Sequence, residues 1–114
     1  MFRQIHEADW KVLRELKPLA LSRYCDRVLD EVVAHASDAE VGSHDRYLAI
    51  FKLIQERDAT LAGAFNGLSR SSALPKLAAM RALGLVTDEE FSRLTLETRE
   101  AVELLLGLDS QRGD

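Results

Sequence analysis

The chain has 114 residues, of which 46% are hydrophobic and 30% are charged, and its formal net charge is −4. This length and balance are typical of one folded domain and exclude an intrinsically disordered chain. The negative net charge argues against a protein that binds nucleic acid through its overall charge.

The sequence also indicates where the protein works. Its single cysteine, Cys25, cannot form an intrachain disulfide, which fits a reducing compartment. The N-terminus is charged early and lacks the apolar core of a signal peptide, and no stretch approaches the length of a membrane span. We therefore expect a cytoplasmic protein that has no membrane partner.

The first helical region is predicted over residues 10–36. Asp9 is a suitable N-cap for a helix that begins at Trp10. Pro18 lies inside this region and has no amide hydrogen, so we expect a kink or a short break beside it. Beyond Pro18 the apolar period resumes, and we expect Cys25 to be a buried, inert side chain there.

Residues 37–42 form a predicted loop, and Ser43 can then cap a long helix over residues 43–68. This helix carries a wide apolar stripe that more than one neighbouring helix must cover. Asp58 is the one polar exception, and we expect it at the edge of the stripe. The stripe consists of Tyr47, Phe51, Ile54, Leu61, Phe65 and Leu68.

A shorter helix is predicted to follow, beginning at Ser71 or Ser72. Pro75 is tolerable in its first turn, where the amide has no partner in any case. Gly84 is predicted to end this helix, with Leu85 packing back onto the last turn in a Schellman motif.

Two more short helices complete the predicted set. Thr87 and Glu90 have the spacing of a capping box, which indicates a helix that begins at this point and ends near Leu94. Thr95 can cap the last helix, and Gly107 is expected to end it.

Residues 74–94 combine spaced apolar residues, a glycine turn and a T-x-E-E-F helix start, carried by Leu77, Met80, Gly84, Leu85, Val86, Thr87, Glu89, Glu90 and Phe91. This pattern resembles the SHOCT family of short helical hairpins. The chain departs from that pattern in Pro75, in an Arg- and Ala-rich first helix and in the further helix after Thr95. The resemblance implies an oligomerisation or interaction element without catalytic residues.

Charges of opposite sign separate along the C-terminal part of the chain. Residues 70–83 contain Arg70, Lys76 and Arg81 and no acid, whereas residues 87–106 contain six acids and two arginines. The basic segment suggests one alternative function, a nucleic-acid-associated regulator. A DNA-binding helix-turn-helix over residues 74–94 is disfavoured, because the three acids at the start of its second helix would repel phosphate.

A second alternative is a small metal-binding helical bundle. His35, Asp38, Glu40 and His44 crowd the loop between the two long helices, although their spacing does not match an EF-hand. Motifs for phosphate binding or nucleophilic catalysis are absent from the sequence. We therefore assign no catalytic residue, no cofactor and no metal ligand.

These observations predict an all-α bundle of about five helices. Two long antiparallel helices over 10–36 and 43–68 are covered by three shorter C-terminal helices, in one domain over residues 1–108 with a flexible tail at 109–114. The expected core consists of Leu13, Leu16, Leu21, Tyr24, Val28, Val32, Tyr47, Phe51, Ile54, Leu61, Phe65, Leu77, Phe91 and Leu105.

The favoured function is a non-catalytic protein-interaction or regulatory module, and its partner is another protein or a second copy in a homodimer. Nucleic acid is the less favoured partner. Small side chains over residues 59–64 would let another backbone approach closely, and Trp10 is either a core anchor or an exposed contact residue. The candidate contact residues are Trp10, Ala59, Ala62, Gly63, Arg70, Lys76 and Arg81.

Overall fold

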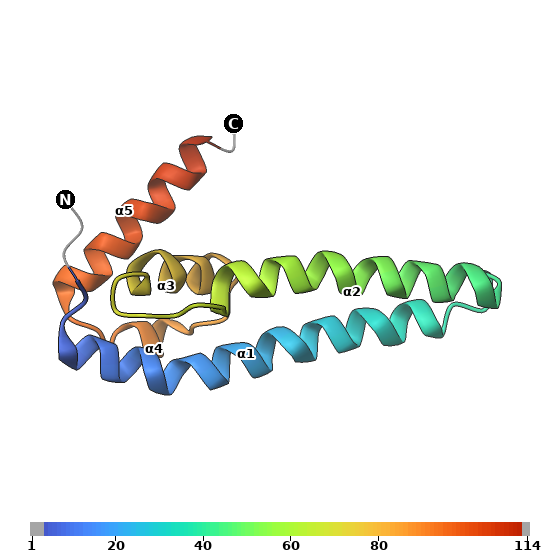
Figure 1. The fold of residues 1–114 in the computed structure, drawn as a ribbon, viewed down its shortest axis with the longest axis horizontal. Helices are drawn as coiled ribbons and strands as arrows, with labels where there is room; N and C mark the ends of the chain where they lie inside the picture. The colour runs from blue at the N-terminus through green and yellow to red at the C-terminus, as the bar shows by residue number, and fades with distance from the viewer. Residues whose placement is uncertain (1–3, 113–114) are drawn as a thin grey trace.

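The computed structural model of the chain describes residues 4–112, with side chains up to residue 107. Within this range the fold is all-α and contains no strand, which confirms the predicted fold class. The helices are α1 (Glu7–Ala36), α2 (Ser43–Phe65), α3 (Ala73–Ala82), α4 (Asp88–Phe91) and α5 (Leu96–Arg112) (Figure 1).

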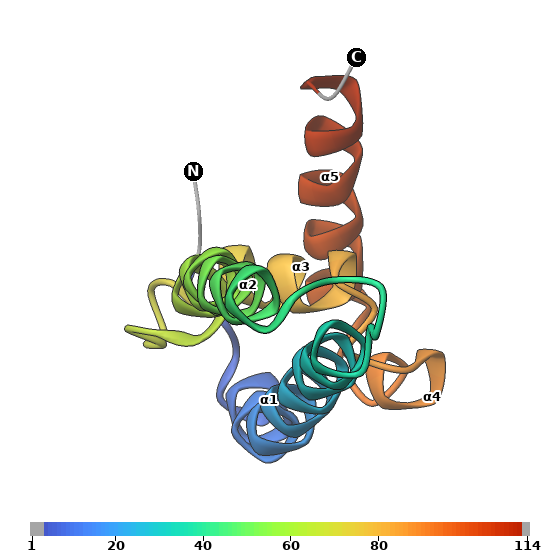
Figure 2. The same ribbon diagram turned by 90° about the vertical axis from the view of Figure 1, so that its right-hand side faces the viewer.

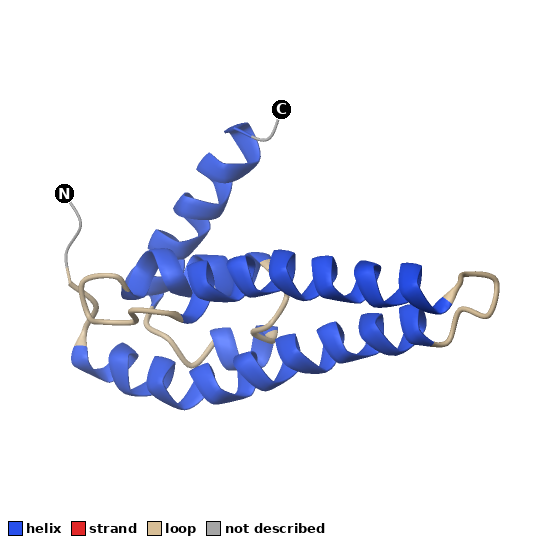
Figure 3. Ribbon diagram, turned by 45° about the vertical axis from the view of Figure 1, so that its right-hand side comes forward, coloured by secondary structure: helices blue, strands red, loops and turns tan. Residues whose placement is uncertain are grey.

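The two long helices form an antiparallel hairpin, and the shorter elements gather at one end of it (Figure 1). The loop over residues 37–42 closes the other end, which we call the tip (Figure 3). The molecule measures 51 × 32 × 24 Å, and its radius of gyration is 16.8 Å. A compact domain of this length would have a radius of gyration of about 13 Å. The hairpin therefore extends well beyond the packed end, which we call the base.

Helix α1 runs without interruption through Pro18, so a break at this residue is not observed. The ribbon bends in the N-terminal part of the helix instead (Figure 1). The bend follows from proline chemistry, because the missing amide hydrogen and the ring loosen one turn without ending the helix.

Asp9 does not cap α1, which begins two residues earlier with His6 as its N-cap residue. Its side chain is buried, and the carboxylate accepts hydrogen bonds from the Thr95 amide at 2.8 Å and from the hydroxyls of Thr95 and Thr98, each at 2.6 Å. Burial raises the pKa of Asp9, but these hydrogen bonds outweigh it and hold the pKa below its ordinary value. Asp9 thus joins α1 to the start of α5.

Helix α3 ends as predicted. Gly84 has a φ of +71°. The Leu85 amide donates to the Met80 carbonyl at 3.0 Å, and the Gly84 amide donates to the Arg81 carbonyl at 2.9 Å. These two bonds are those of a Schellman motif, and glycine adopts the positive φ without steric cost.

The capping box of α4 is also confirmed, and α1 binds to it. Arg23 on α1 donates two hydrogen bonds to the Glu90 carboxylate, at 2.7 and 2.9 Å, and a third to the Leu85 carbonyl at 2.8 Å. The hydrogen bond from Arg23 lowers the pKa of Glu90 to about 2. Arg27, one turn further along, donates to the carbonyls of Leu83 and Gly84 at the end of α3.

Three other predicted boundaries need correction. Helix α2 ends at Phe65 and does not reach residue 68. Gly42 is the N-cap residue of α2, so Ser43 is already inside the helix. Helix α5 continues through Gly107 to Arg112, because an interior glycine costs a helix only about 1 kcal/mol. The predicted tail over 109–114 is therefore helical up to Arg112, and residues 113–114 lie outside the described residues.

The core lies at the base of the hairpin, where α1, the end of α2, α3, α4 and the start of α5 meet. Six of the predicted core residues are buried, namely Leu13, Leu16, Tyr24, Phe65, Leu77 and Phe91. Four more pack against the core with partial exposure, namely Leu21, Val28, Leu61 and Leu105. Val32 is half-buried outside this core.

Three predicted core residues on α2, Tyr47, Phe51 and Ile54, are exposed, so this part of the prediction is wrong. The reason is the length of the covering helices. Helix α3 has 10 residues and α4 has 4, whereas α2 has 23. At 1.5 Å per residue α3 spans about 15 Å, less than half of the roughly 35 Å of α2. The short helices therefore cover the base of the hairpin and not its outer half.

Candidate interaction surface

Large apolar side chains are exposed along the outer half of the hairpin. The exposed fractions are 60% for Leu29 and 62% for Val33 on α1, and 63% for Tyr47, 55% for Phe51 and 48% for Ile54 on α2. We call these five residues the hairpin face. Isolated exposed apolar side chains are common, but a contiguous group of them marks a binding surface.

The five residues lie on the same side of the hairpin. Leu29 and Val33 are one turn apart on α1, and Tyr47, Phe51 and Ile54 follow the i, i+4, i+7 spacing of one stripe on α2. Leu29 and Ile54 line one groove between the two helices. The α1 and α2 stripes therefore meet at this groove and form one continuous surface.

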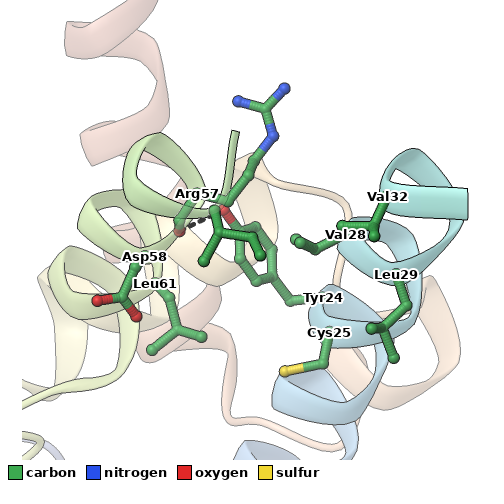
Figure 4. Close-up of a pocket in the computed structure, with 9 residues that line it drawn as sticks. Tyr24, Cys25, Val28, Leu29, Val32, Arg57, Asp58 and Leu61 are labelled. Carbon is green, nitrogen blue, oxygen red and sulfur yellow. Dashed lines mark hydrogen bonds between the residues drawn. The ribbon is translucent and has the colours of Figure 1, made fainter. Parts of the chain in front are cut away.

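The groove has a volume of about 270 Å³. Figure 4 shows Cys25 and Leu29 on one wall and Asp58 and Leu61 on the other. Cys25 is exposed, so the expectation that it is buried is wrong. Most of the lining is apolar: the residues are Tyr24, Cys25, Val28, Leu29, Val32, Ile54, Arg57, Asp58 and Leu61.

Polar contacts fix the spacing of the two helices at this groove. The Tyr24 hydroxyl donates to the Arg57 carbonyl at 2.8 Å (Figure 4). The Arg57 guanidinium in turn binds the Glu31 carboxylate at 2.9 Å. The groove is therefore part of the folded hairpin and does not have to open for a partner to bind.

The opposite flank of the hairpin is occupied by the short helices. Arg23 and Arg27 reach from α1 to the α3–α4 turn, and the Lys76 ammonium on α3 donates to the Gly63 carbonyl on α2 at 2.8 Å. Figure 2, which looks along the hairpin, shows α3 and α4 on one side of it. Within the part of the chain that the structure describes, the hairpin face thus lies away from α3 and α4.

The small residues proposed as a contact patch lie at the base end of α2. Ala59 and Gly63 are exposed and Ala62 is half-buried. Trp10, the other candidate, is half-buried and packs against the core. The Arg70 guanidinium lies 5.2 Å from the centre of the Trp10 ring. These candidates lie outside the hairpin face, which sequence reasoning did not identify as a surface.

The three candidate cations all bind groups of their own chain. Arg70 pairs with Glu7 at 2.6 Å, in addition to its position over Trp10. Lys76 binds the Gly63 carbonyl, as described above. Arg81 donates to the Val86 carbonyl at 2.7 Å and to Asp88 at 2.5 Å, and it lies 4.5 Å from the centre of the Phe91 ring. A nucleic acid would have to compete with these contacts.

The candidate metal ligands His35, Asp38, Glu40 and His44 are all exposed. Among the described residues, no three side chains of His, Cys, Asp or Glu are placed to hold a metal ion. None of the described helices is long and apolar enough to cross a membrane.

Comparison of the chain with protein-family models, with curated proteins and with solved structures gave no match. The resemblance of residues 74–94 to the SHOCT family therefore stays a prediction. Its local geometry, a Schellman turn followed by a capping box, is present, but a well-capped helical hairpin of any family has both features.

Proposed function

We propose that this chain is a non-catalytic protein-interaction module that binds its partner through the hairpin face. The observation that carries the proposal is the size of this apolar surface. A large apolar side chain presents roughly 200 Å², so the five exposed fractions correspond to on the order of 600 Å². Patches of this size on monomeric proteins are often functional.

The location is part of the proposal. Cys25 is an exposed thiol at the edge of the groove and the only cysteine of the chain. A reducing compartment keeps such a thiol free of disulfides. A binding surface that includes Cys25 therefore stays unmodified in that compartment. These points support a cytoplasmic module.

The proposal is tested by capturing partners from a lysate of the natural host with the tagged chain and with two variants. Phe51→Glu places a charge within the hairpin face, where a bound partner would have to desolvate it. Ala34→Glu adds the same charge at an exposed position of α1, on the flank of that helix that carries Arg23 and Arg27 and lies away from the face. Both side chains are exposed, so both variants should fold as the native chain does.

The expected result is a protein captured in stoichiometric amount by the native chain and by Ala34→Glu, and lost with Phe51→Glu. An additional copy of the chain itself counts as such a protein. Equal capture by all three baits would show that the hairpin face is not the binding surface, and the proposed function would then be wrong in its central point.

A further inference from the structure

We propose that the occupant of the hairpin face is the same face of a second copy of the chain, so that two hairpins form a four-helix bundle. This inference rests on the proposed function and names the partner. Each copy contributes half of the bundle, and the base of each molecule, with α3, α4 and α5, remains outside it.

The first support is the direction in which apolar side chains point on each helix. Apolar residues occur in adjacent pairs, Val32–Val33 on α1 and Leu53–Ile54 on α2. The first member of each pair is more buried than the second. Successive residues of a helix differ by about 100°. Each helix therefore carries one apolar row toward its hairpin partner and a second row about a right angle away.

Two apolar rows at a right angle are what a helix of a four-helix bundle requires, because it has two neighbours at the corners of a square. A single helix lying in the groove would cover Cys25 and Leu61 but leave the outer side chains, Val33 and Phe51, largely in water. A second hairpin covers both rows, and another copy of this chain carries a matching hairpin.

The second support is the area. Two faces of on the order of 600 Å² would bury about 1,200 Å² in total, which reaches the lower end of the range for specific interfaces. We therefore expect a dimer that forms and dissociates reversibly, rather than one that is permanent.

The charges of the face are compatible with self-association. None of its five residues is a carboxylic acid, a histidine, a lysine or an arginine, and Asp58 is the acidic residue in the groove beside them. Asp58 lies one turn from Ile54 toward the base. Two hairpins that pack with their tips in opposite directions keep the two Asp58 carboxylates apart along the bundle, which limits their repulsion.

The test is sedimentation equilibrium of the purified full-length chain over a range of about 1–200 µM, which brackets the affinity of a small interface. The average mass should rise from near 12.8 kDa toward twice that value. Phe51→Glu and Val33→Glu should each raise the dimer dissociation constant by at least about tenfold, whereas Ala34→Glu should leave it unchanged. Circular dichroism of each variant checks that its helices are retained.

Alkylation of Cys25 gives a second readout, because this lone thiol lies in the groove that the second hairpin would cover. Its rate should fall several-fold as the native chain is concentrated and stay constant for Phe51→Glu. Protection in the native chain that is absent in the variant would place the dimer contact at the groove.

Two outcomes would overturn the inference. If the native chain stays monomeric over the whole range of protein concentration, no second copy binds its hairpin face. If Phe51→Glu then still loses a partner from lysate, the proposed function stands and only the identity of the occupant is wrong. A dimer that all three variants form equally well uses another surface, and the inference is then wrong as well.

Discussion

Asp9 connects α1 to the start of α5 through its side-chain hydrogen bonds. Its carboxylate accepts three hydrogen bonds from Thr95 and Thr98, and the side chain is 1% exposed. Asparagine has one acceptor oxygen in place of two and would turn its amide hydrogens toward donors. We expect Asp9→Asn to lower the free energy of unfolding by about 2–3 kcal/mol. Urea denaturation measures this, with the exposed Asp30→Asn as the control that should change it little.

Glu90 makes stability depend on pH. Its pKa falls from an ordinary value of 4.5 in the unfolded chain to about 2 in the folded chain, mainly through the hydrogen bond from Arg23. A group whose pKa is lower when folded stabilises the fold above its unfolded pKa and loses this effect as the pH falls through the folded pKa. The native chain should therefore lose stability between about pH 4.5 and pH 2.

Glu90→Gln isolates this contribution. The variant should unfold more easily at pH 7, by about 1–2 kcal/mol after allowance for solvent screening. It should also show a smaller loss of stability on acidification, although Asp9 still contributes a loss at low pH. Thermal unfolding at several pH values measures both effects. If the neighbouring exposed variant Glu89→Gln had the same pH profile as Glu90→Gln, the ion pair with Arg23 would not be the cause.

At the scale of the elements, the α3–α4 turn needs a glycine. A Cβ at Gly84 would meet only the Arg27 guanidinium, at 3.6 Å, so the space is adequate. The φ of +71° is the obstacle, because it strains an L-amino acid. We expect Gly84→Ala to destabilise the fold by about 1 kcal/mol.

Gly63→Ala should change the stability of the fold in the opposite direction. Gly63 lies inside α2 with open space around its Cα, so an alanine there should stabilise the helix by about 0.5–1 kcal/mol. Urea denaturation of both variants would separate the two effects. A stabilising Gly84→Ala would contradict the Schellman geometry assigned to the turn.

Local signals in the sequence predicted the elements well, because capping depends on neighbouring residues. The Thr87–Glu90 capping box and the Gly84 ending were both found at the predicted positions. Asp9 was misplaced because its partners, Thr95 and Thr98, are more than 80 residues away in the sequence. A good N-cap residue binds whichever helix start the fold brings to it, and the sequence order of the chain does not reveal which one.

The hairpin face was missed for a related reason. Helical periodicity identifies an apolar stripe, but it does not say whether the chain itself covers that stripe. Tyr47 and Phe51 follow the same period as Phe65, which is buried. The difference lies in the lengths of the helices, since α3 and α4 together are shorter than α2. Comparing these lengths would have indicated that one end of the hairpin stays uncovered.

At the scale of the whole molecule, the hairpin tip should be less stable than the base. In the monomer, Leu53 is the one large apolar side chain that is buried in the outer half of α2, whereas the base buries most of the core. Local opening requires less free energy where few apolar contacts are lost. In monomeric Phe51→Glu, amide hydrogen exchange over residues 28–36 and 44–54 should be faster than over residues 13–24.

The measurement that tests the central claim most directly is photo-crosslinking in the natural host cell. A photoreactive amino acid is placed either at Ile54, in the hairpin face, or at Ala34, an exposed residue on the flank of α1 that carries Arg23 and Arg27. We predict an abundant crosslinked product from position 54 and little from position 34, with a mass that identifies the occupant. Absence of a product at position 54, or equal products at both positions, would contradict the claim that this protein binds through its hairpin face.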